Sequence, residues 1–366
     1  ARSGYAAFVG DGSVLPRESS LSTRPMKGAV PFRSPSSLRV TVELPSGRRV
    51  SGMALPAGFT VITGGGYHGK TTLLEAIQEG VYDHVRGDGR ELVVSRRRAV
   101  LVKAEDGRIV SHVDISSFVD GVPGGADTRD FSTMDASGST SMAASISEAL
   151  EAGAELLLID EDTSATNLLY RDEGMEAIIR EEPIRPLCLQ VRDLVRRTGA
   201  SVVAVASASS SLLGQADRVV LMENYVPRDV TAEARRLAGG RGRQLDYRPP
   251  RARLFHGIRG LRRVRAKGFK LVAEYDDGVR FELDLAGYPR LVEKAQVNAI
   301  ACIVARLRRL ERPVGVRELA DRINDALSSR GFSAFADPVP PDLALVDGFD
   351  VVWVLNRMYN AVFSQR

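Results

Sequence analysis

The chain has 366 residues, of which 44% are hydrophobic and 26% charged, and its formal net charge is +4 at pH 7. This composition allows two or three folded domains and argues against disorder throughout. Two cysteines, Cys188 and Cys302, are too few for a disulfide framework or a zinc site, and no run approaches the ~20 apolar residues of a membrane span. We therefore expect an intracellular, soluble protein without a membrane partner.

The N-terminal region, residues 1–58, is rich in Pro, Gly and Ser and contains short alternating runs such as "LRVTVELPSG", which predict strands and turns. The opening "ARSGYAAFVGDGSV" is already typical of a strand. We therefore expect a β-rich segment that begins inside a longer protein.

Residues 59–238 predict the core domain. The buried strand "FTVITG" leads through a glycine loop into the helical pattern "TTLLEAIQEGVY", and strand-like runs occupy 91–119. Further on come the helical pattern "TSMAASISEALEA", the apolar strand "AELLLID", an amphipathic helix over 186–198, and the strands "ASVVAVAS" and "ADRVVLMEN". Continuous apolar strands that alternate with helices predict an α/β fold, with a parallel sheet covered on both faces.

The composition changes after residue 238. Residues 239–250 are rich in Gly, Arg and Pro and predict a linker. Residues 251–366 then predict a small, basic α+β domain with a basic strand, a β-hairpin ("KLVAEYDDGVRFELDL") and three helices. Trp353, Tyr359 and Phe363 fall on a helical pattern, where we expect them in the core.

The stretch "GGGYHGKTT" fits the P-loop pattern, because Gly64 is followed by four residues and then by Gly69, Lys70 and Thr71. The backbone N–H groups of such a loop and the N-terminus of the following helix favour phosphate groups. We expect Lys70 to reach the β- and γ-phosphates of ATP and Thr71 to bind Mg²⁺, whereas His68 has a second interpretation as a residue that only shapes the loop. The residues expected to bind ATP here are Gly64, Gly65, Gly66, Tyr67, His68, Gly69, Lys70, Thr71 and Thr72.

Two carboxylates end the apolar strand in "LLLIDED". We expect Asp160 to hold Mg²⁺ through water and Glu161 to orient or deprotonate the water that attacks ATP. Acidic residues after a strand are also common as turn or cap residues, and the P-loop is what favours the catalytic interpretation.

The stretch "DASGSTS", residues 135–141, precedes a helical pattern of small residues. Ser137 and Gly138 at a helix N-terminus suit close approach to a phosphate. By itself the stretch is also a plausible helix cap, since Ser and Asp are usual capping residues.

The order of these motifs resembles the nucleotide-binding domain of ABC ATPases. Residues 136–140 align with the signature "LSGGQ", with Ser137 and Gly138 matching and Ser139 in place of the second glycine. "DEDTSATN" is similar to the ABC run "DEPTSALD", with Asn167 at the position of the D-loop aspartate. The resemblance implies a P-loop NTPase fold of ABC type, binding of ATP and Mg²⁺, and a head-to-tail homodimer. In that dimer Ser137, Gly138 and Ser139 of one subunit cover the ATP on the other.

Two departures from that pattern affect function. Ser207 stands where ABC domains have the switch histidine, so turnover is expected to be slow, although we still assign Ser207 to the catalytic set with Glu161 and Lys70. The segment between Lys70 and Ser137 is shorter than in ABC transporters, which disfavours a transporter ATPase subunit. Phe32 and Arg39 are the candidates for stacking on adenine.

Longer stretches, including "SVLPRESSLSTRPMKGAVPF" and "GGGYHGKTTLLEAI", resemble a narrower group, the predicted ATPases of the ABC class. These are soluble bacterial and protist proteins, and a mitochondrial member in trypanosomes is linked to the RNA-editing machinery. The resemblance implies a domain before this chain. It also implies a mitochondrial matrix location for a trypanosome protein and a cytoplasmic one for a bacterial protein.

A basic segment over 248–270 contains no acidic residue and has aromatic residues interleaved, which suits single-stranded RNA. The alternative is a solvated face beside a flexible linker. ATPase activity on or with RNA, in an RNA-processing complex, is thus the expected function, and an ATP-gated protein-assembly module with little turnover is the competing one. The expected RNA-binding residues are Arg259, Arg262, Arg263, Arg265, Lys267 and Lys270.

Overall fold

A computed structural model describes residues 4–19, 22–122, 124–171, 178–179, 181–207, 209–238 and 243–366. The chain forms two compact units, one of Ala1–Ala104 with Ala154–Pro249 and the other of Glu105–Gly153 with Pro250–Arg366. These units do not follow the boundaries expected from sequence, since residues 105–153 group with the C-terminal part. The helices of the described residues include none that is long and apolar enough to cross a membrane.

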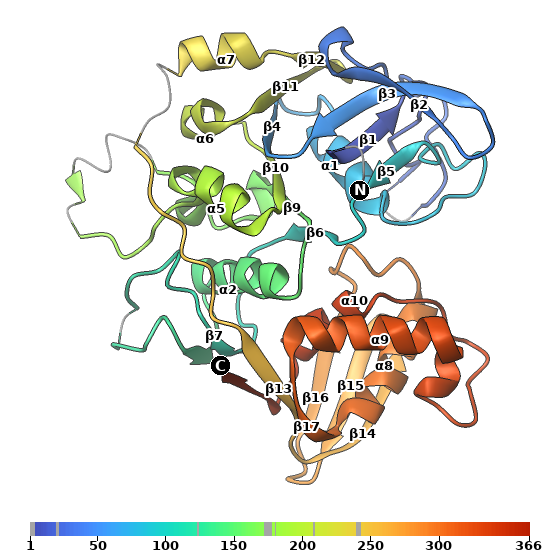
Figure 1. Ribbon diagram of the computed structural model, residues 1–366, viewed down its shortest axis with the longest axis vertical. Coiled ribbons are helices and arrows are strands. Elements are labelled where there is room, and N and C mark those ends of the chain that lie inside the picture. The colour runs from blue at the N-terminus through green and yellow to red at the C-terminus, as the bar shows by residue number, and fades with distance from the viewer. Residues whose placement is uncertain are drawn as a thin grey trace. The chain divides into compact units, whose positions relative to one another are not determined.

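The first unit is built on a six-stranded sheet in the order β12-β11-β4-β10-β9-β6 (Figure 1). β11, β4, β10, β9 and β6 are parallel, and β12 is antiparallel at one edge. The predicted parallel sheet of apolar strands is therefore confirmed. The bounds are β4 (Phe59–Thr63), β6 (Ala99–Val102), β9 (Leu156–Asp160), β10 (Ser201–Val205), β11 (Arg218–Glu223) and β12 (Val226–Asp229).

A four-stranded antiparallel sheet, ordered β2-β3-β1-β5, forms the N-terminal part of this unit. Its strands are β1 (Tyr5–Gly10), β2 (Arg39–Glu43), β3 (Arg49–Pro56) and β5 (Val93–Ser95). Helix α1 (Lys70–Glu79) shares one buried cluster with both sheets, and that cluster takes Leu156 and Leu158 of β9 but not Leu157. Because strand side chains alternate between faces, this core lies on one face of the parallel sheet.

Short helices complete the first unit. The helix expected over 186–198 is divided into a 3₁₀ turn and α5, and α5 packs against β4 and β10. The helices are α3 (Thr166–Leu169), α5 (Val191–Thr198), α6 (Ser210–Gln215) and α7 (Thr231–Leu237), with 3₁₀ turns η1 (Ser36–Leu38), η2 (Glu161–Thr163) and η3 (Leu187–Leu189).

The second unit contains helix α2 (Gly138–Glu151), a hairpin of β7 (Val110–Val113) and β8 (Phe131–Thr133), and two three-stranded sheets, β17-β13-β18 and β14-β15-β16. The expected hairpin is confirmed as β15 paired with β16, and α8 packs along β14 (Figure 1). The other bounds are β13 (Arg253–Ile258), β14 (Leu261–Lys267), β15 (Lys270–Tyr275), β16 (Arg280–Asp284), α8 (Lys294–Leu307), β17 (Arg309–Gly315), α9 (Val316–Arg330), η4 (Gly331–Ala334), α10 (Gly348–Leu355) and β18 (Ala361–Gln365).

The C-terminal end differs from expectation. The three helical patterns are confirmed as α8, α9 and α10, but the helix expected through Phe363 is wrong. Trp353 belongs to α10, whereas Phe363 lies on β18, which pairs with β13. The β-branched and aromatic residues of "AVFSQ" extend this strand, and Phe363 packs on Phe255 with ring centroids 5.2 Å apart.

Helix α2 is held in the second unit by a buried ionic cluster, Glu105–Arg108–Glu148–Arg357. Arg108 Nη2 donates to Glu148 Oε2 at 2.7 Å, and the side chain of Glu148 is fully buried. Arg357, just after α10, donates through Nε to Glu105 Oε2 at 2.8 Å and lies over the Trp353 ring, 3.8 Å from its centroid. Burial alone would raise the pKa of Glu105, but the Arg357 guanidinium outweighs burial and lowers that pKa to about 2.

The last residue of α2 is held in a similar way. Arg253 on β13 donates to Glu151 from Nη2 at 2.7 Å and from Nε at 2.9 Å, and Nη2 also donates to Asn356 Oδ1 at 2.9 Å. The side chain of Arg253 is only 1% exposed. The second half of α2 is thus tied to the C-terminal segment at several points by buried, charge-assisted hydrogen bonds.

Candidate functional site

The P-loop and carboxylate residues expected at the ATP site lie at one edge of the parallel sheet, because three strands end there together. Val205 of β10 pairs with Asp160 of β9 on one side and with Ile62 of β4 on the other. The P-loop follows β4, and Glu161 follows β9. In open α/β sheets this carboxyl edge is where ligands bind.

The P-loop has a backbone that requires glycine at two positions. Gly64 has a φ of 141°, and a Cβ there would lie 2.3 Å from the Met222 carbonyl oxygen. Gly69 has a φ of 90° and is the N-cap of α1. Tyr67 also has a positive φ, 62°, and its side chain is 98% exposed. The loop therefore presents an aromatic ring to solvent at its tip.

Lys70, the first residue of α1, folds back over the loop. Its Nζ donates to the carbonyl oxygens of Gly64 at 2.8 Å and of Gly65 at 2.7 Å. The ammonium group is therefore held above the loop that is expected to wrap the phosphates. Thr72 follows on α1, half-buried.

The chemistry of Thr71 and Asp160 fits a magnesium site. Thr71 Oγ1 donates to Asp160 Oδ2 at 3.1 Å, and Asp160 is 3% exposed. A hydroxyl and one carboxylate are the protein ligands that Mg²⁺ commonly takes beside substrate phosphates. Among the described residues no group of three His, Cys, Asp or Glu side chains could hold a metal ion.

Glu161 accepts hydrogen bonds on both carboxylate oxygens. The backbone N–H of Ser207 donates to Oε2 at 2.6 Å, and the hydroxyl of Tyr170 donates to Oε1 at 2.5 Å. Ser207 thus reaches Glu161 through its main chain, whereas the sequence singled it out for its position, where ABC domains have the switch histidine. Tyr170 was missed because no motif extends to it.

A hairpin turn that the motifs did not indicate lies against the P-loop. Asn224 and Tyr225, between β11 and β12, have φ values of 49° and 68°. The Asn224 N–H donates to His68 Nδ1 at 3.0 Å, and a Cβ on Gly69 would lie 3.2 Å from the Tyr225 ring. This hydrogen bond connects His68 to the hairpin turn. It agrees with the interpretation that His68 shapes the loop.

The signature candidates lie in the second unit. Ser137 is the N-cap of α2, with its Oγ 3.0 Å from Thr140 Oγ1 and accepting from the Thr140 N–H, and Gly138 and Ser139 form the first turn. The capping role is therefore present, and it leaves the phosphate-binding role of this helix terminus as a prediction. Asn167 lies on α3 in the first unit, with its side chain exposed.

The adenine-stacking candidates differ from each other. Phe32 is 3% exposed and belongs to the core cluster around α1, so it cannot stack on a base. Arg39 is exposed, and its Nε donates to Ser34 Oγ at 2.8 Å.

The six expected RNA-binding side chains are all exposed. Arg262 and Arg265 lie near carboxylates, 3.9 Å from Asp276 and 3.8 Å from Glu274. Strand register places the side chain of Arg265 on the same face as Glu282 of β16, so acidic groups interrupt this face. Phe255, one of the aromatic residues interleaved in this basic segment, is fully buried and so cannot stack on a base.

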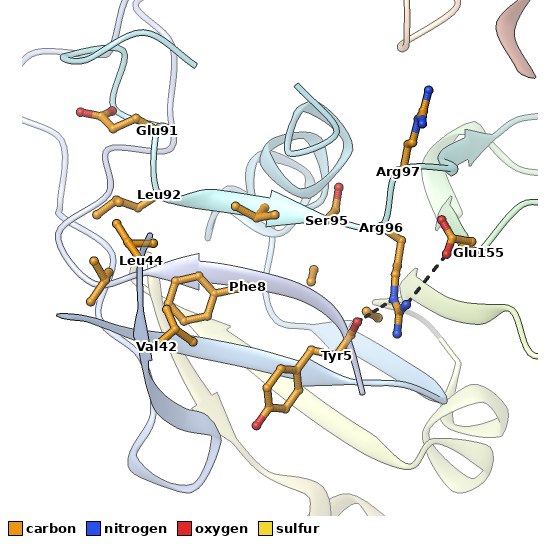
Figure 2. Close-up of a pocket in the computed structure, with 14 residues that line it drawn as sticks. Tyr5, Phe8, Val42, Leu44, Glu91, Leu92, Ser95, Arg96, Arg97 and Glu155 are labelled. Atoms are coloured by element: carbon orange, nitrogen blue, oxygen red, sulfur yellow. Dashed lines mark hydrogen bonds and ion pairs between the residues drawn. The ribbon is translucent and has the colours of Figure 1, made fainter. Parts of the chain in front are cut away.

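A separate hollow of about 670 Å³ lies on the outer face of the N-terminal sheet (Figure 2). Its lining is mostly apolar, including Phe8, Val42 and Val94, and contains no P-loop residue. At one end Arg96 donates to the Tyr5 carbonyl at 2.8 Å and lies 3.9 Å from Glu155. This hollow is distinct from the sheet edge that carries the P-loop.

Comparison with known proteins finds one similar sequence and several similar structures. The chain is 33% identical over 206 residues to "Uncharacterized protein MJ1628" of Methanocaldococcus jannaschii, a match that spans 54% of this chain and 44% of that protein. Among solved structures it is similar to cbiO1 from Clostridium perfringens, part of the ABC transporter complex cbiONQ, at 15% identity and a TM-score of 0.34, covering 61% of this chain and 87% of that one. It is also similar to a bacterial Atm1-family ABC exporter with ATP bound, at 12% identity and a TM-score of 0.31, covering 61% and 38%.

The family comparison covers both the P-loop strand and the strand that carries Asp160. A model of the ABC_ATPase P-loop domain matches residues 1–254, more than half of the chain. The fold is accordingly that of a P-loop NTPase of ABC type, with additional β-sheets in the C-terminal region. The chain belongs to the ABC_ATPase P-loop domain family.

Proposed function

We propose that this protein binds ATP with Mg²⁺ and hydrolyses it at the carboxyl edge of β4, β9 and β10. The observation that carries the proposal is the contact between Thr71 Oγ1 and Asp160 Oδ2, which joins the P-loop helix to the carboxylate strand. Lys70 would bind the β- and γ-phosphates, and Thr71 with Asp160 would hold Mg²⁺. The bound ion would neutralise phosphate charge, and Glu161 would orient the attacking water or accept its proton.

Steady-state ATP hydrolysis by Glu161→Gln tests this assignment. The amide keeps the shape of the side chain but cannot take a proton, so we expect kcat to fall about 100-fold while ATP binding persists. Glu43→Gln on β2, whose side chain is exposed, is the matched control and should hydrolyse like the wild type. Equal rates for Glu161→Gln and the wild type would remove Glu161 from the mechanism.

We also propose a head-to-tail homodimer in which Ser137, Gly138 and Ser139 of one copy contact ATP on the other. The N-terminus of α2 supports this, because the dipole at a helix N-terminus attracts anions. Sedimentation of the Glu161→Gln variant should show a dimer with ATP and a monomer with ADP. Gly138→Asp should abolish the ATP-dependent dimer through repulsion of the phosphate, and a dimer retained by that variant would contradict the shared site.

For the basic segment we propose contacts with single-stranded RNA, beside an RNA-processing complex. Four of its side chains, Arg259, Arg263, Lys267 and Lys270, form no ion pair with a described residue and are exposed. Such charges would bind phosphates without sequence preference. The buried Phe255 removes one stacking residue, so electrostatics would supply most of the affinity.

The RNA proposal is tested with a fluorescent single-stranded oligonucleotide at several salt concentrations. The double variant Arg263→Ala/Lys267→Ala should weaken binding and flatten the salt dependence, by a slope of about 0.7 for each phosphate that the variant no longer neutralises. Arg317→Ala/Arg322→Ala, which removes the same charge from α9, is the control. If both double variants bind RNA like the wild type, the basic segment is not the RNA-binding surface. If the wild type binds no RNA, the chain is better described as an ATP-gated assembly module with protein partners.

A further inference from the structure

The carboxylate of Glu161 is fixed by groups from two different parts of the first unit. Ser207 follows β10 and donates its main-chain N–H to Oε2, and Tyr170 follows α3 and donates its hydroxyl to Oε1. Each oxygen thus receives one short bond from a different direction. Two bonds of this kind restrict rotation about the last torsions of a glutamate side chain.

Tyr170 is placed by the short helix that follows the carboxylate turn. Leu168 and Leu169 of α3 are fully buried and anchor the helix. Tyr170 is its C-cap and has an extended backbone, with φ −153°, which ends the helix directly at the tyrosine. Its hydroxyl donates a hydrogen bond to Glu161, which lies nine positions earlier in the sequence. The buried leucines therefore anchor the helix that ends at Tyr170, and the carboxylate of Glu161 accepts the hydrogen bond from its hydroxyl.

The phenol keeps its proton at the pH values where enzymes work. Burial raises the pKa of Tyr170, and the hydrogen bond to Glu161 raises it further, to about 12. The hydroxyl of Tyr170 therefore donates this hydrogen bond, and Glu161 Oε1 accepts it. The direction of this hydrogen bond is thus fixed by chemistry.

We propose that Tyr170 is a positioning residue for hydrolysis, because its hydroxyl aims the Glu161 carboxylate at the place of the attacking water. This inference rests on the proposed ATPase function. In this inference the Tyr170 hydroxyl positions Oε1 of Glu161, and the main-chain N–H of Ser207 positions Oε2. Tyr170 touches neither ATP nor water in this role and acts through Glu161 alone.

The experiment compares Tyr170→Phe, which removes one hydroxyl and keeps the ring, with the wild type in steady-state ATP hydrolysis. We expect kcat to fall about tenfold, the usual scale for loss of an orienting hydrogen bond, while KM for ATP and the melting temperature stay unchanged. Tyr5→Phe removes a hydroxyl that has no hydrogen bond to a described residue, so it is the matched control and should leave both parameters unchanged.

A double-mutant cycle distinguishes positioning from general structural support. In single turnovers of the Glu161→Gln variant, adding Tyr170→Phe should cause no further loss, because the hydroxyl acts only through the carboxylate. An equal tenfold loss in both backgrounds, or unchanged kcat in Tyr170→Phe, would overturn the inference and leave the ATPase proposal standing. Absence of turnover in the wild type would overturn both.

Discussion

The parallel sheet of the first unit and helix α2 of the second hold their polar side chains under opposite conditions. At the sheet edge, Lys70 and Glu161 lie beyond the ends of strands whose own residues are mostly apolar and buried. In α2, by contrast, Ser145 and Glu148 are themselves buried and are satisfied by Arg108 and Arg357. A polar group at the sheet edge is therefore available for chemistry, whereas one in α2 is part of the packing. Removing the first kind should cost activity, and removing the second kind should cost stability.

The contrast between the sheet edge and α2 predicts its largest loss of stability for Arg357→Ala. This substitution removes the arginine bound to the half-buried Glu105 and one of the two arginines beside the buried Glu148, so the free energy of unfolding should fall by about 3 kcal/mol. Denaturant unfolding measures this loss. Arg322→Ala breaks an exposed ion pair with Glu318 on α9 and should cost about 0–1 kcal/mol. Similar losses in the two variants would break the contrast.

Acid should weaken the second unit through Glu105. Its pKa is about 2 in the folded protein and 4.5 as an unperturbed side chain, so the unfolded state binds its proton first as the pH falls. The stabilisation by Glu105 is complete above 4.5 and is lost as the pH falls from 4.5 towards 2. Between pH 4.5 and 2, the free energy of unfolding should depend less on pH in Glu105→Gln than in the wild type. A variant with the same pH dependence as the wild type would show that Glu105 is not the titrating group.

A smaller effect is expected at the start of α2. Ser137→Ala removes the side chain that accepts from the Thr140 N–H, and the loss of such a cap costs about 1 kcal/mol of stability. Ser137→Asn, which can also cap, should restore stability. Full stability in Ser137→Ala would mean that the ionic cluster alone sets the position of this helix.

The smallest effect is expected for Ser207→Ala at the sheet edge. Its donor to Glu161 is the backbone N–H, which alanine retains, so the activation free energy should change by no more than about 0.5 kcal/mol. Ser207→Pro removes that N–H and should lower kcat much more. The ratio of kcat in Ser207→Ala to kcat in Ser207→Pro measures how much the main-chain N–H of Ser207 contributes to hydrolysis.

The sequence predicted the sheet and the P-loop well, because each of these features is local. "FTVITGGGYHGKTT" contains the strand, the loop and the helix start in one run, and Asp160 and Glu161 directly follow an apolar strand. A parallel sheet brings such strand ends together by its geometry alone. The roles of these site residues in catalysis and binding stay predictions.

The parts that could not be predicted depend on distant partners. Arg357 and Glu105 are 252 positions apart, and nothing near either residue indicates the other. The small residues of α2 predicted a helix correctly, but their burial against arginine depends on tertiary packing. Tyr170 is similar, since its hydrogen bond to Glu161 arises from the way α3 ends.

The second unit is assembled from two separate stretches of chain, and this affects how the protein can be divided for study. A truncation after Pro249 follows the linker expected from sequence, but it would leave α2 and remove Arg253 and Arg357. Glu105, Glu148 and Glu151 would then lose cations that neutralise them. An ATPase fragment prepared in this way would expose a charged helix face and aggregate or unfold locally, whereas a fragment that joins residues 105–153 to 250–366 retains the arginine partners of α2.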